Sequence, residues 1–190
     1  MQTLTKKIVL ASQSPRRKQL LEQAGFSFDI RIKSIEEVYP SDLPVEEIAP
    51  YLAKQKAQAA FELLKEGEIL LTADSVVILD GKVYEKPKDR TDAVRILQDL
   101  SGKTHKVITG VCLKSMQKEV SFSGESLVSM ETLTEEEINF YIDQYQPYDK
   151  AGSYAVQEWI GLCKIYKIEG TYANIMGLPV DLVYKALQLF

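Results

Sequence analysis

Two short segments of the chain combine side chains that could bind phosphate or activate water. In the first, Ser12, Arg16 and Arg17 surround Pro15, directly after the apolar run Ile8–Ala11. If Pro15 opens a helix, unpaired backbone N–H groups and the helix dipole favour an anion at this place. The hydroxyl and guanidinium groups add further donors for phosphate. A capped surface helix with a solvated basic first turn accounts for the same residues, so this segment alone leaves both interpretations open.

The second segment places a carboxylate at the end of an apolar run. Asp74 and Ser75 directly follow Ile69–Ala73, which is strand-like. A carboxylate at the carboxyl end of a strand is a common catalytic position in α/β proteins, where it can hold a divalent metal or activate water. The alternative is an aspartate that starts a turn.

Charged residues at other places could complete a phosphate or metal site. Lys86 follows an Asp-Gly hairpin signal and could reach a phosphate, and Glu36 and Glu37 could bind a metal. A solvated surface residue is the more ordinary explanation of each. Lys54 and Lys56 lie on different faces of an expected helix, so at most one of them faces a site.

The segment 149–157 mixes charge, small residues and an amide. It contains Lys150, and Gln157 could read the edge of a nucleobase through paired donor and acceptor groups. An irregular loop with local hydrogen bonds is the alternative. His105 could be a general base, but a neutral structural histidine at the start of a strand is the favoured interpretation.

Motifs of other phosphate-binding classes are absent from the sequence. It contains neither a P-loop, nor the GxGxxG dinucleotide motif, nor a GxSxG nucleophile elbow. Carboxylates and basic residues at the ends of elements instead fit metal-assisted attack on a phosphate ester or anhydride.

Composition narrows the class of protein further. The chain has 190 residues, of which 45% are hydrophobic and 26% charged, with a net charge of -4. This acidity argues against a broad nucleic-acid-binding surface but allows basic residues focused on a small anion. We expect Cys112 and Cys163 to be buried thiols in a reducing compartment. The start of the chain has too short an apolar run for a signal peptide or membrane span, which predicts a cytoplasmic protein.

Strand-like and helix-like segments alternate along the chain, which predicts an α/β fold with a mixed sheet and two lobes around a central cleft. We expect strands at Ile8–Ala11, Phe26–Ile32, Ile69–Ala73, Val76–Leu79, Lys82–Tyr84, His105–Leu113, Val120–Met130 and Ile160–Ile168. We expect a helix from Pro15 to about Gly25 with Ser14 as cap, and one over Val45–Leu64 with a start or kink at Pro50. Further helices are expected from Thr91 to just before Gly102, from a Thr134 capping box through Tyr141, and over Val180–Phe190.

Taken together, these segments resemble the Maf family of nucleotide pyrophosphatases. The matching stretches occur in the family's order and cover nearly all of residues 1–190, which we treat as one domain. They are LASQSPRRKQLL (10–21), IEE (35–37), LAKQKA (52–57), TADSVV (72–77), EKP (85–87), LSGKTHKVITGV (100–111), DKAGSYAVQ (149–157) and MGLPV (176–180).

The resemblance implies a fold like that of the inosine triphosphate pyrophosphatases and hydrolysis of a nucleoside triphosphate to the monophosphate and pyrophosphate. It also implies a divalent metal, Mg²⁺ or Mn²⁺, and a homodimer. By the same resemblance Asp74 matches the proposed catalytic base, and Glu36 or Glu37 the acidic position near the metal. The polar residues that match those lining the family's cleft are Ser12, Arg17, Lys56, Lys86 and Lys150.

Three positions indicate the branch of the family that acts on dTTP and UTP. These are Arg16, Ser75 and Gln157, where the branch acting on 7-methyl-GTP has a bulky aromatic, an amide and a glutamate. The chain departs from the usual pattern at Ser75, Thr72, Ala155, Glu158 and Trp159. If the loop shifts by one residue, Glu158 instead of Gln157 faces the base. The alternative function is a non-catalytic, nucleotide-responsive regulator of septum formation and cell division.

Overall fold

The computed structural model describes residues 2–190, which form two compact units. The first unit takes in the chain up to Asp74, together with Thr109–Gly124 and Gly177–Phe190. The second unit takes in Ser75–Ile108 and Glu125–Met176. Segments that are far apart in the sequence therefore share a unit.

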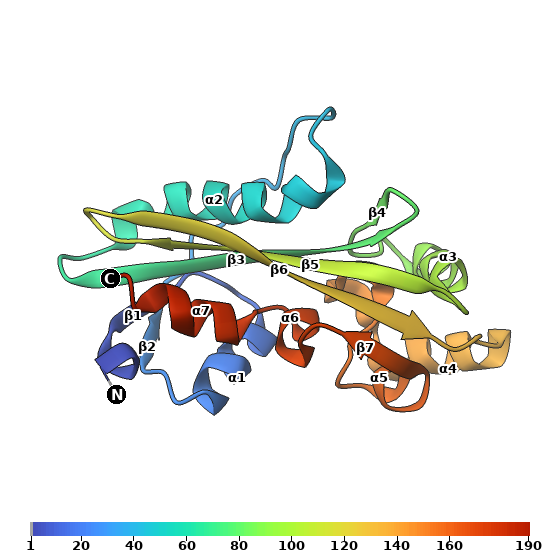
Figure 1. Cartoon of the computed structure of the whole chain (residues 1–190). Helices are drawn as coiled ribbons and strands as arrows, with labels where there is room; N and C mark the ends of the chain where they lie inside the picture. Colours follow the sequence, from blue (N-terminus) through green and yellow to red (C-terminus); the bar gives the residue numbers. More distant parts are fainter. Residues whose placement is uncertain (1) are drawn as a thin grey trace. The chain divides into compact units, whose positions relative to one another are not determined.

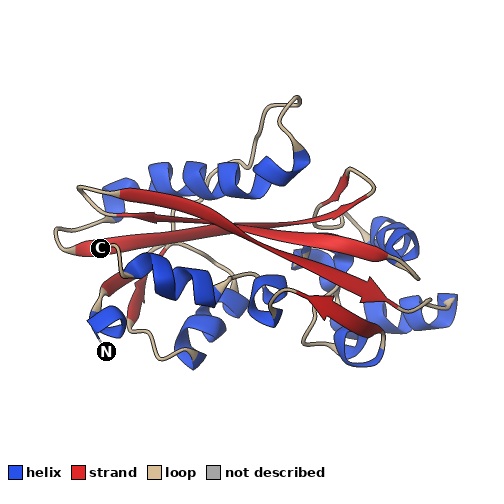
Figure 2. Ribbon diagram, in the orientation of Figure 1, coloured by secondary structure: helices blue, strands red, loops and turns tan. Residues whose placement is uncertain are grey.

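One mixed sheet is built from seven strands. They are β1 (Lys7–Leu10), β2 (Phe28–Ile30), β3 (Glu68–Leu79), β4 (Lys82–Tyr84), β5 (Thr104–Lys114), β6 (Glu119–Met130) and β7 (Ile165–Glu169). Their order is β2-β1-β3-β5-β6-β7, with β4 paired to β3. β1 pairs parallel with β2 and β3, whereas the β3–β4 and β6–β7 pairs are antiparallel. Figure 2 shows β3, β5 and β6 as the long strands, and each contributes residues to both units. The predicted α/β fold with a mixed sheet is confirmed.

The first unit packs helices on both faces of its strands. α2 (Ile48–Ala60) lies on one face, whereas α1 (Pro15–Gln23) and α7 (Val180–Leu187) lie on the other (Figure 1). The face of α2 toward the sheet carries small residues, including Ala53 and Ala57, which pack with buried strand residues such as Leu70. Small side chains let the helix approach the strands closely.

The second unit has its own hydrophobic core. α3 (Arg90–Leu100) and α4 (Glu135–Tyr145) contact each other, and two short helices follow, α5 (Trp159–Cys163) and α6 (Tyr172–Met176). Leu97 and Tyr141 from the helices pack with Val107 and Met130 from the strands. The predicted capping box begins α4, because Thr134 and Glu137 exchange side-chain to backbone hydrogen bonds.

Several predicted boundaries are wrong for local reasons. The expected strand Ile160–Ile168 is instead α5 followed by β7, because the chain folds back so tightly that a Cβ on Gly161 would lie 1.8 Å from the Val156 carbonyl oxygen. The two strands expected on either side of Asp74 form one continuous strand, β3. Asp89, not Thr91, caps α3, since its side chain accepts a hydrogen bond from the backbone of the first turn.

The helix starts at the two prolines also differ in detail from expectation. Pro15 does open α1, but the Ser14 side chain makes no capping hydrogen bond. Pro50 lies in the first turn of α2, where its missing N–H would have no intrahelical partner, so it neither begins nor kinks the helix. None of the helices within residues 2–190 combines the length and the apolar character that crossing a bilayer requires.

Candidate active site

Asp74 lies on β3 and is 7% exposed, and its carboxylate is paired with a lysine of the first unit. Lys56 Nζ on α2 donates to Asp74 Oδ1 over 2.5 Å and lies 2.7 Å from Glu37 Oε1. One ammonium therefore joins two carboxylates that are 37 residues apart in the chain. Both adjacent glutamates are exposed, and the structure brings Glu37, not Glu36, into this cluster.

Two residues set the position of α2, and with it the position of Lys56. Thr72 precedes Asp74 by two residues on β3, so both side chains point to the same face of the strand. Thr72 Oγ1 is buried and donates to the Ala53 carbonyl oxygen of α2 over 2.7 Å. On β5, a Cβ at Gly110 would lie 2.2 Å from the Pro50 nitrogen, so only glycine allows this close approach. The contact between Lys56 and Asp74 thus depends on direct packing of α2 against the sheet.

The turn before α1 forms a second polar group in the first unit. Ser12 Oγ accepts hydrogen bonds from the Ser14 backbone N–H and from Arg17 Nη1, each over 3.2 Å. Arg17 Nε donates to the Gly177 carbonyl oxygen over 2.9 Å. Burial lowers the pKa of the Arg17 guanidinium, and Arg16 lowers it further, while the carboxylates of Asp74 and Glu37 act in the opposite direction. Arg17 therefore lies within the electrostatic reach of the Asp74 cluster.

In the second unit, one hydrogen bond joins the segments that carry the two other predicted lysines. The Gly152 N–H donates to the Glu85 carbonyl oxygen over 3.2 Å, next to Lys86 and two residues from Lys150. Gly152 has a φ of +71°, and a Cβ there would lie 2.8 Å from Val77, so this close contact requires glycine.

The ammonium of Lys150 is mostly buried and held by two carboxylates. Its Nζ donates to Asp149 Oδ1 over 2.8 Å and lies 3.5 Å from Glu158 Oε1. Lys86, in contrast, is exposed.

A family model described as Maf-like protein matches residues 7–190. The chain belongs to the Maf-like protein family. It is 48% identical to the dTTP/UTP pyrophosphatase of Bacteroides thetaiotaomicron, over 95% of this chain and 94% of the relative. It is also 48% identical to the dTTP/UTP pyrophosphatase of Porphyromonas gingivalis (strain ATCC 33277), over 97% of this chain and 94% of the relative.

The fold of this Maf-like chain is shared with a solved structure of low sequence identity. The Ham1 protein of Staphylococcus aureus superposes with a TM-score of 0.57 at 12% identity, over 96% of this chain and 98% of that one. The expected resemblance to the fold of the inosine triphosphate pyrophosphatases is confirmed at the level of fold.

In this Maf-like chain, Glu158 is engaged in structural contacts. Its Oε2 accepts a hydrogen bond from the buried Tyr141 hydroxyl, which itself accepts from the Ala155 N–H over 3.0 Å. Burial and the Glu158 carboxylate raise the pKa of Tyr141, so the phenol remains a donor. Gln157 Oε1, by contrast, is buried without a hydrogen-bond partner in the part of the chain that the structure describes. The Glu158 carboxylate is therefore paired, whereas the Gln157 acceptor is not.

The histidine and the two cysteines singled out in the sequence differ in their burial. His105 is buried, and its Nε2 lies 2.7 Å from the Tyr154 hydroxyl. Burial lowers the pKa of His105 to about 4, so the ring is neutral at physiological pH, as a structural histidine should be. Cys112 is buried as expected, and burial raises the pKa of its thiol to about 12. Cys163 is exposed, so the expectation that both thiols are buried is wrong. It ends the short helix α5, whose buried residue is Ile160.

The predicted site residues thus fall into two groups. The first unit holds Ser12, Arg16, Arg17, Glu36, Glu37, Lys56 and Asp74, and the second holds Ser75, Lys86, Lys150 and Gln157. Because successive side chains of a strand point to opposite faces, Ser75 does not share the face of Asp74. The roles of Gly177 and Tyr141 have no local sequence signal, because their partners lie 160 and 17 residues away.

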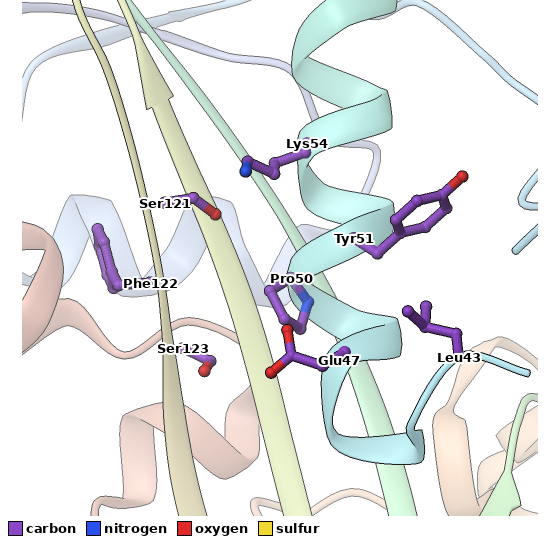
Figure 3. Close-up of a pocket in the computed structure, with 8 residues that line it drawn as sticks. All are labelled: Leu43, Glu47, Pro50, Tyr51, Lys54, Ser121, Phe122 and Ser123. Atoms are coloured by element: carbon purple, nitrogen blue, oxygen red, sulfur yellow. The ribbon is translucent and has the colours of Figure 1, made fainter. Parts of the chain in front are cut away.

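A groove of about 420 Å³ in the first unit contains none of the predicted site residues. Figure 3 shows Lys54 extending from α2 toward Ser121 of β6 in this groove. The residues that line it are Leu43, Glu47, Pro50, Tyr51, Lys54, Ser121, Phe122 and Ser123. Lys54 and Lys56 therefore lie on different faces of α2, as predicted.

Proposed function

We propose that this chain is a nucleoside triphosphate pyrophosphatase that hydrolyses dTTP and UTP to the monophosphate and pyrophosphate. The observation that carries the proposal is the 48% identity, over 95% of the chain, to a protein named dTTP/UTP pyrophosphatase. The cluster of Asp74, Lys56 and Arg17 supports it, because these residues bring a carboxylate and cationic groups together.

The residues of the first unit fit a divalent metal ion. Glu37 Oε1 and Asp74 Oδ1 both lie within 2.7 Å of one cationic atom, Lys56 Nζ, so two hard oxygen donors already converge on a cation. Carboxylate oxygens suit Mg²⁺ and Mn²⁺, which commonly use one or two carboxylates together with substrate phosphates. Glu37 and Asp74 would hold this ion, which when bound neutralises charge on phosphate oxygens. Glu36 has no such contact among the described residues and is the weaker candidate.

Asp74 is the residue that we assign as general base. Lys56 bonds to its Oδ1, so Oδ2 is the oxygen that accepts a proton from water. The water oxygen bonds to a phosphorus of the triphosphate, the bond from phosphorus to the bridging oxygen breaks, and pyrophosphate leaves. Arg17 and the Ser12 turn bind phosphate oxygens in this scheme.

The second unit contributes further substrate contacts in this proposal. Lys86 and Lys150 bind phosphate, and the unpaired Gln157 Oε1 accepts from the N–H of uracil or thymine. A glutamine amide offers a donor beside this acceptor, which matches the mixed edge of both bases. We assign Arg16 and Ser75 to the same choice of substrate from the family resemblance alone.

We further propose that the two units act as one catalytic domain over residues 1–190, and that a homodimer acts in the cytoplasm to remove unwanted nucleotides. These statements rest on the family resemblance. The homodimer predicts a mass near twice 21.5 kDa in sedimentation equilibrium, and a monomer there would contradict it.

Pyrophosphate release from a panel of triphosphates tests the function. The purified protein is incubated with dTTP, UTP, dCTP, purine triphosphates and 7-methyl-GTP, with Mg²⁺ and with EDTA. We expect metal-dependent release that favours dTTP and UTP. Preference for 7-methyl-GTP would contradict the roles of Arg16, Ser75 and Gln157. Nucleotide binding without release, by protein shown to be folded, would favour the cell-division regulator instead.

A further inference from the structure

The ammonium of Lys56 occupies the point on which the two proposed metal-binding carboxylates converge. It lies 2.5 Å from Asp74 Oδ1 and 2.7 Å from Glu37 Oε1, and the Asp74 side chain is only 10% exposed. We infer that Lys56 is a built-in counter-ion that keeps divalent metal out of the site until a nucleotide binds, so that metal and triphosphate bind together. The inference rests on the proposed function and adds a binding order to it.

Geometry makes the ammonium and the metal alternatives to each other. A Mg²⁺ ion requires oxygen ligands at about 2.1 Å, and Mn²⁺ only slightly more. An ion at that distance from the same two oxygens would have to share them with the Lys56 ammonium, which already lies within hydrogen-bonding distance of both. Since two cations at contact distance repel each other, we expect the ammonium to move when a metal binds both carboxylates.

Charge favours the same conclusion. Glu37 and Asp74 supply two negative charges, Lys56 offsets one of them, and Arg17 lies within electrostatic reach. A divalent cation that approaches this cluster is repelled by the Lys56 ammonium at contact range and, to a smaller degree, by Arg17. The nucleotide-free site is therefore a poor ligand for metal.

The number of protein ligands points to the nucleotide as the missing component. Within residues 2–190, no three His, Cys, Asp or Glu side chains gather in a way that could hold a metal. Octahedral Mg²⁺ has six ligands, so two carboxylates leave most positions to water or to phosphate oxygens. A triphosphate supplies such oxygens and also gives the displaced Lys56 ammonium a new anionic partner.

Direct measurement of Mn²⁺ binding, without turnover, tests this inference. Mn²⁺ alone is titrated into the wild-type protein and the variants Lys56→Gln, Lys56→Arg and Lys54→Gln, and free Mn²⁺ is followed by electron paramagnetic resonance. Removal of a like charge at contact distance should tighten Mn²⁺ binding to Lys56→Gln by about tenfold or more. Lys56→Arg keeps the charge and should bind as weakly as the wild type. Lys54→Gln is the matched control, because Lys54 lies on the same helix but faces the groove.

A second measurement uses only the wild-type protein, so it stands even if Lys56→Gln fails to fold. Affinity for α,β-imido-dTTP, which resists hydrolysis between these phosphates, is measured by calorimetry with and without Mn²⁺. We expect Mn²⁺ to tighten analogue binding by about tenfold or more, since coupling between two ligands is reciprocal. An affinity for the analogue that does not change with Mn²⁺ would overturn the inference. In the Mn²⁺ titrations, tight binding by the nucleotide-free wild type would overturn it as well, and so would an unchanged Mn²⁺ affinity in a folded Lys56→Gln.

The outcomes separate this inference from the proposed function. If the wild type hydrolyses dTTP but shows no coupling between Mn²⁺ and the analogue, the counter-ion role fails and the function stands. If Lys56→Gln gains Mn²⁺ affinity and the analogue is coupled to metal, yet no triphosphate is hydrolysed, the function fails and the counter-ion role stands.

Discussion

At the scale of single residues, the one histidine of the chain couples stability to pH. His105 is 1% exposed, and burial lowers its pKa from 6.5 to about 4. The unfolded chain therefore binds a proton below pH 6.5 that the folded protein accepts only near pH 4. Stability is full above pH 6.5 and falls as the pH drops through this window, by about 3 kcal/mol in total.

The variant His105→Gln isolates this contribution. It lacks the titrating ring, so its free energy of unfolding should change less between pH 6.5 and 4 than that of the wild type. Urea unfolding at several pH values measures both slopes, and carboxylates contribute to both proteins alike. Equal slopes in the two proteins would show that His105 does not cause the pH dependence.

Residue types and their places in elements predicted part of the candidate site. The apolar run before Asp74 makes it a candidate catalytic carboxylate, the resemblance to the Maf family adds Lys56, and the structure joins the two side chains. The choice between Glu36 and Glu37 could not be made, because both lie in an irregular segment without a periodic face. The contact of Arg17 with the Gly177 carbonyl had no local signal either, since the carbonyl belongs to the backbone 160 residues away.

At the scale of elements, α2 and β5 approach each other through Gly110. A Cβ at this position would lie 2.2 Å from backbone of α2, so Gly110→Ala must displace the helix that carries Lys56. We expect a loss of about 2 kcal/mol or more in the free energy of unfolding, together with reduced dTTP hydrolysis. Urea unfolding and pyrophosphate release measure the two effects.

Gly81→Ala is the comparison for this prediction. Gly81 has a φ of +74°, but apart from its two chain neighbours no residue has an atom within 4 Å of the place that a Cβ would take, so alanine there should cost only about 1 kcal/mol of backbone strain. It lies in the β3–β4 turn, outside the candidate site, and should leave hydrolysis unchanged. Equal effects of the two substitutions on stability and activity would mean that close packing of α2 is unimportant.

Elements with a strong periodic or capping signal were predicted well, whereas short ones were not. The hairpin strand β4 and the capping box of α4 follow from local sequence. The sequence predicts one strand over Ile160–Ile168, but its apolar run is compatible with both helix and strand. The fold-back of Val156 onto Gly161 decides between them, and composition does not reveal that contact.

At the scale of the whole molecule, the candidate residues belong to two units built from interleaved segments of the chain. The order of motifs in the sequence predicted the family, and the match over residues 7–190 confirms it. The order of motifs could not predict which motifs lie in the same unit, because the chain passes from one unit to the other several times. A predicted cleft between two lobes stays a prediction, as does the binding of one nucleotide by both groups of residues.

The most direct test of the account compares steady-state pyrophosphate release from dTTP by the wild type and by Asp74→Asn, with Mg²⁺ present. Asparagine has nearly the same shape but cannot accept the proton, so we predict a fall in kcat of about a hundredfold or more. Circular dichroism and thermal unfolding should find the variant folded. Near-normal turnover by Asp74→Asn, or no release of pyrophosphate by the folded wild type, would contradict the account.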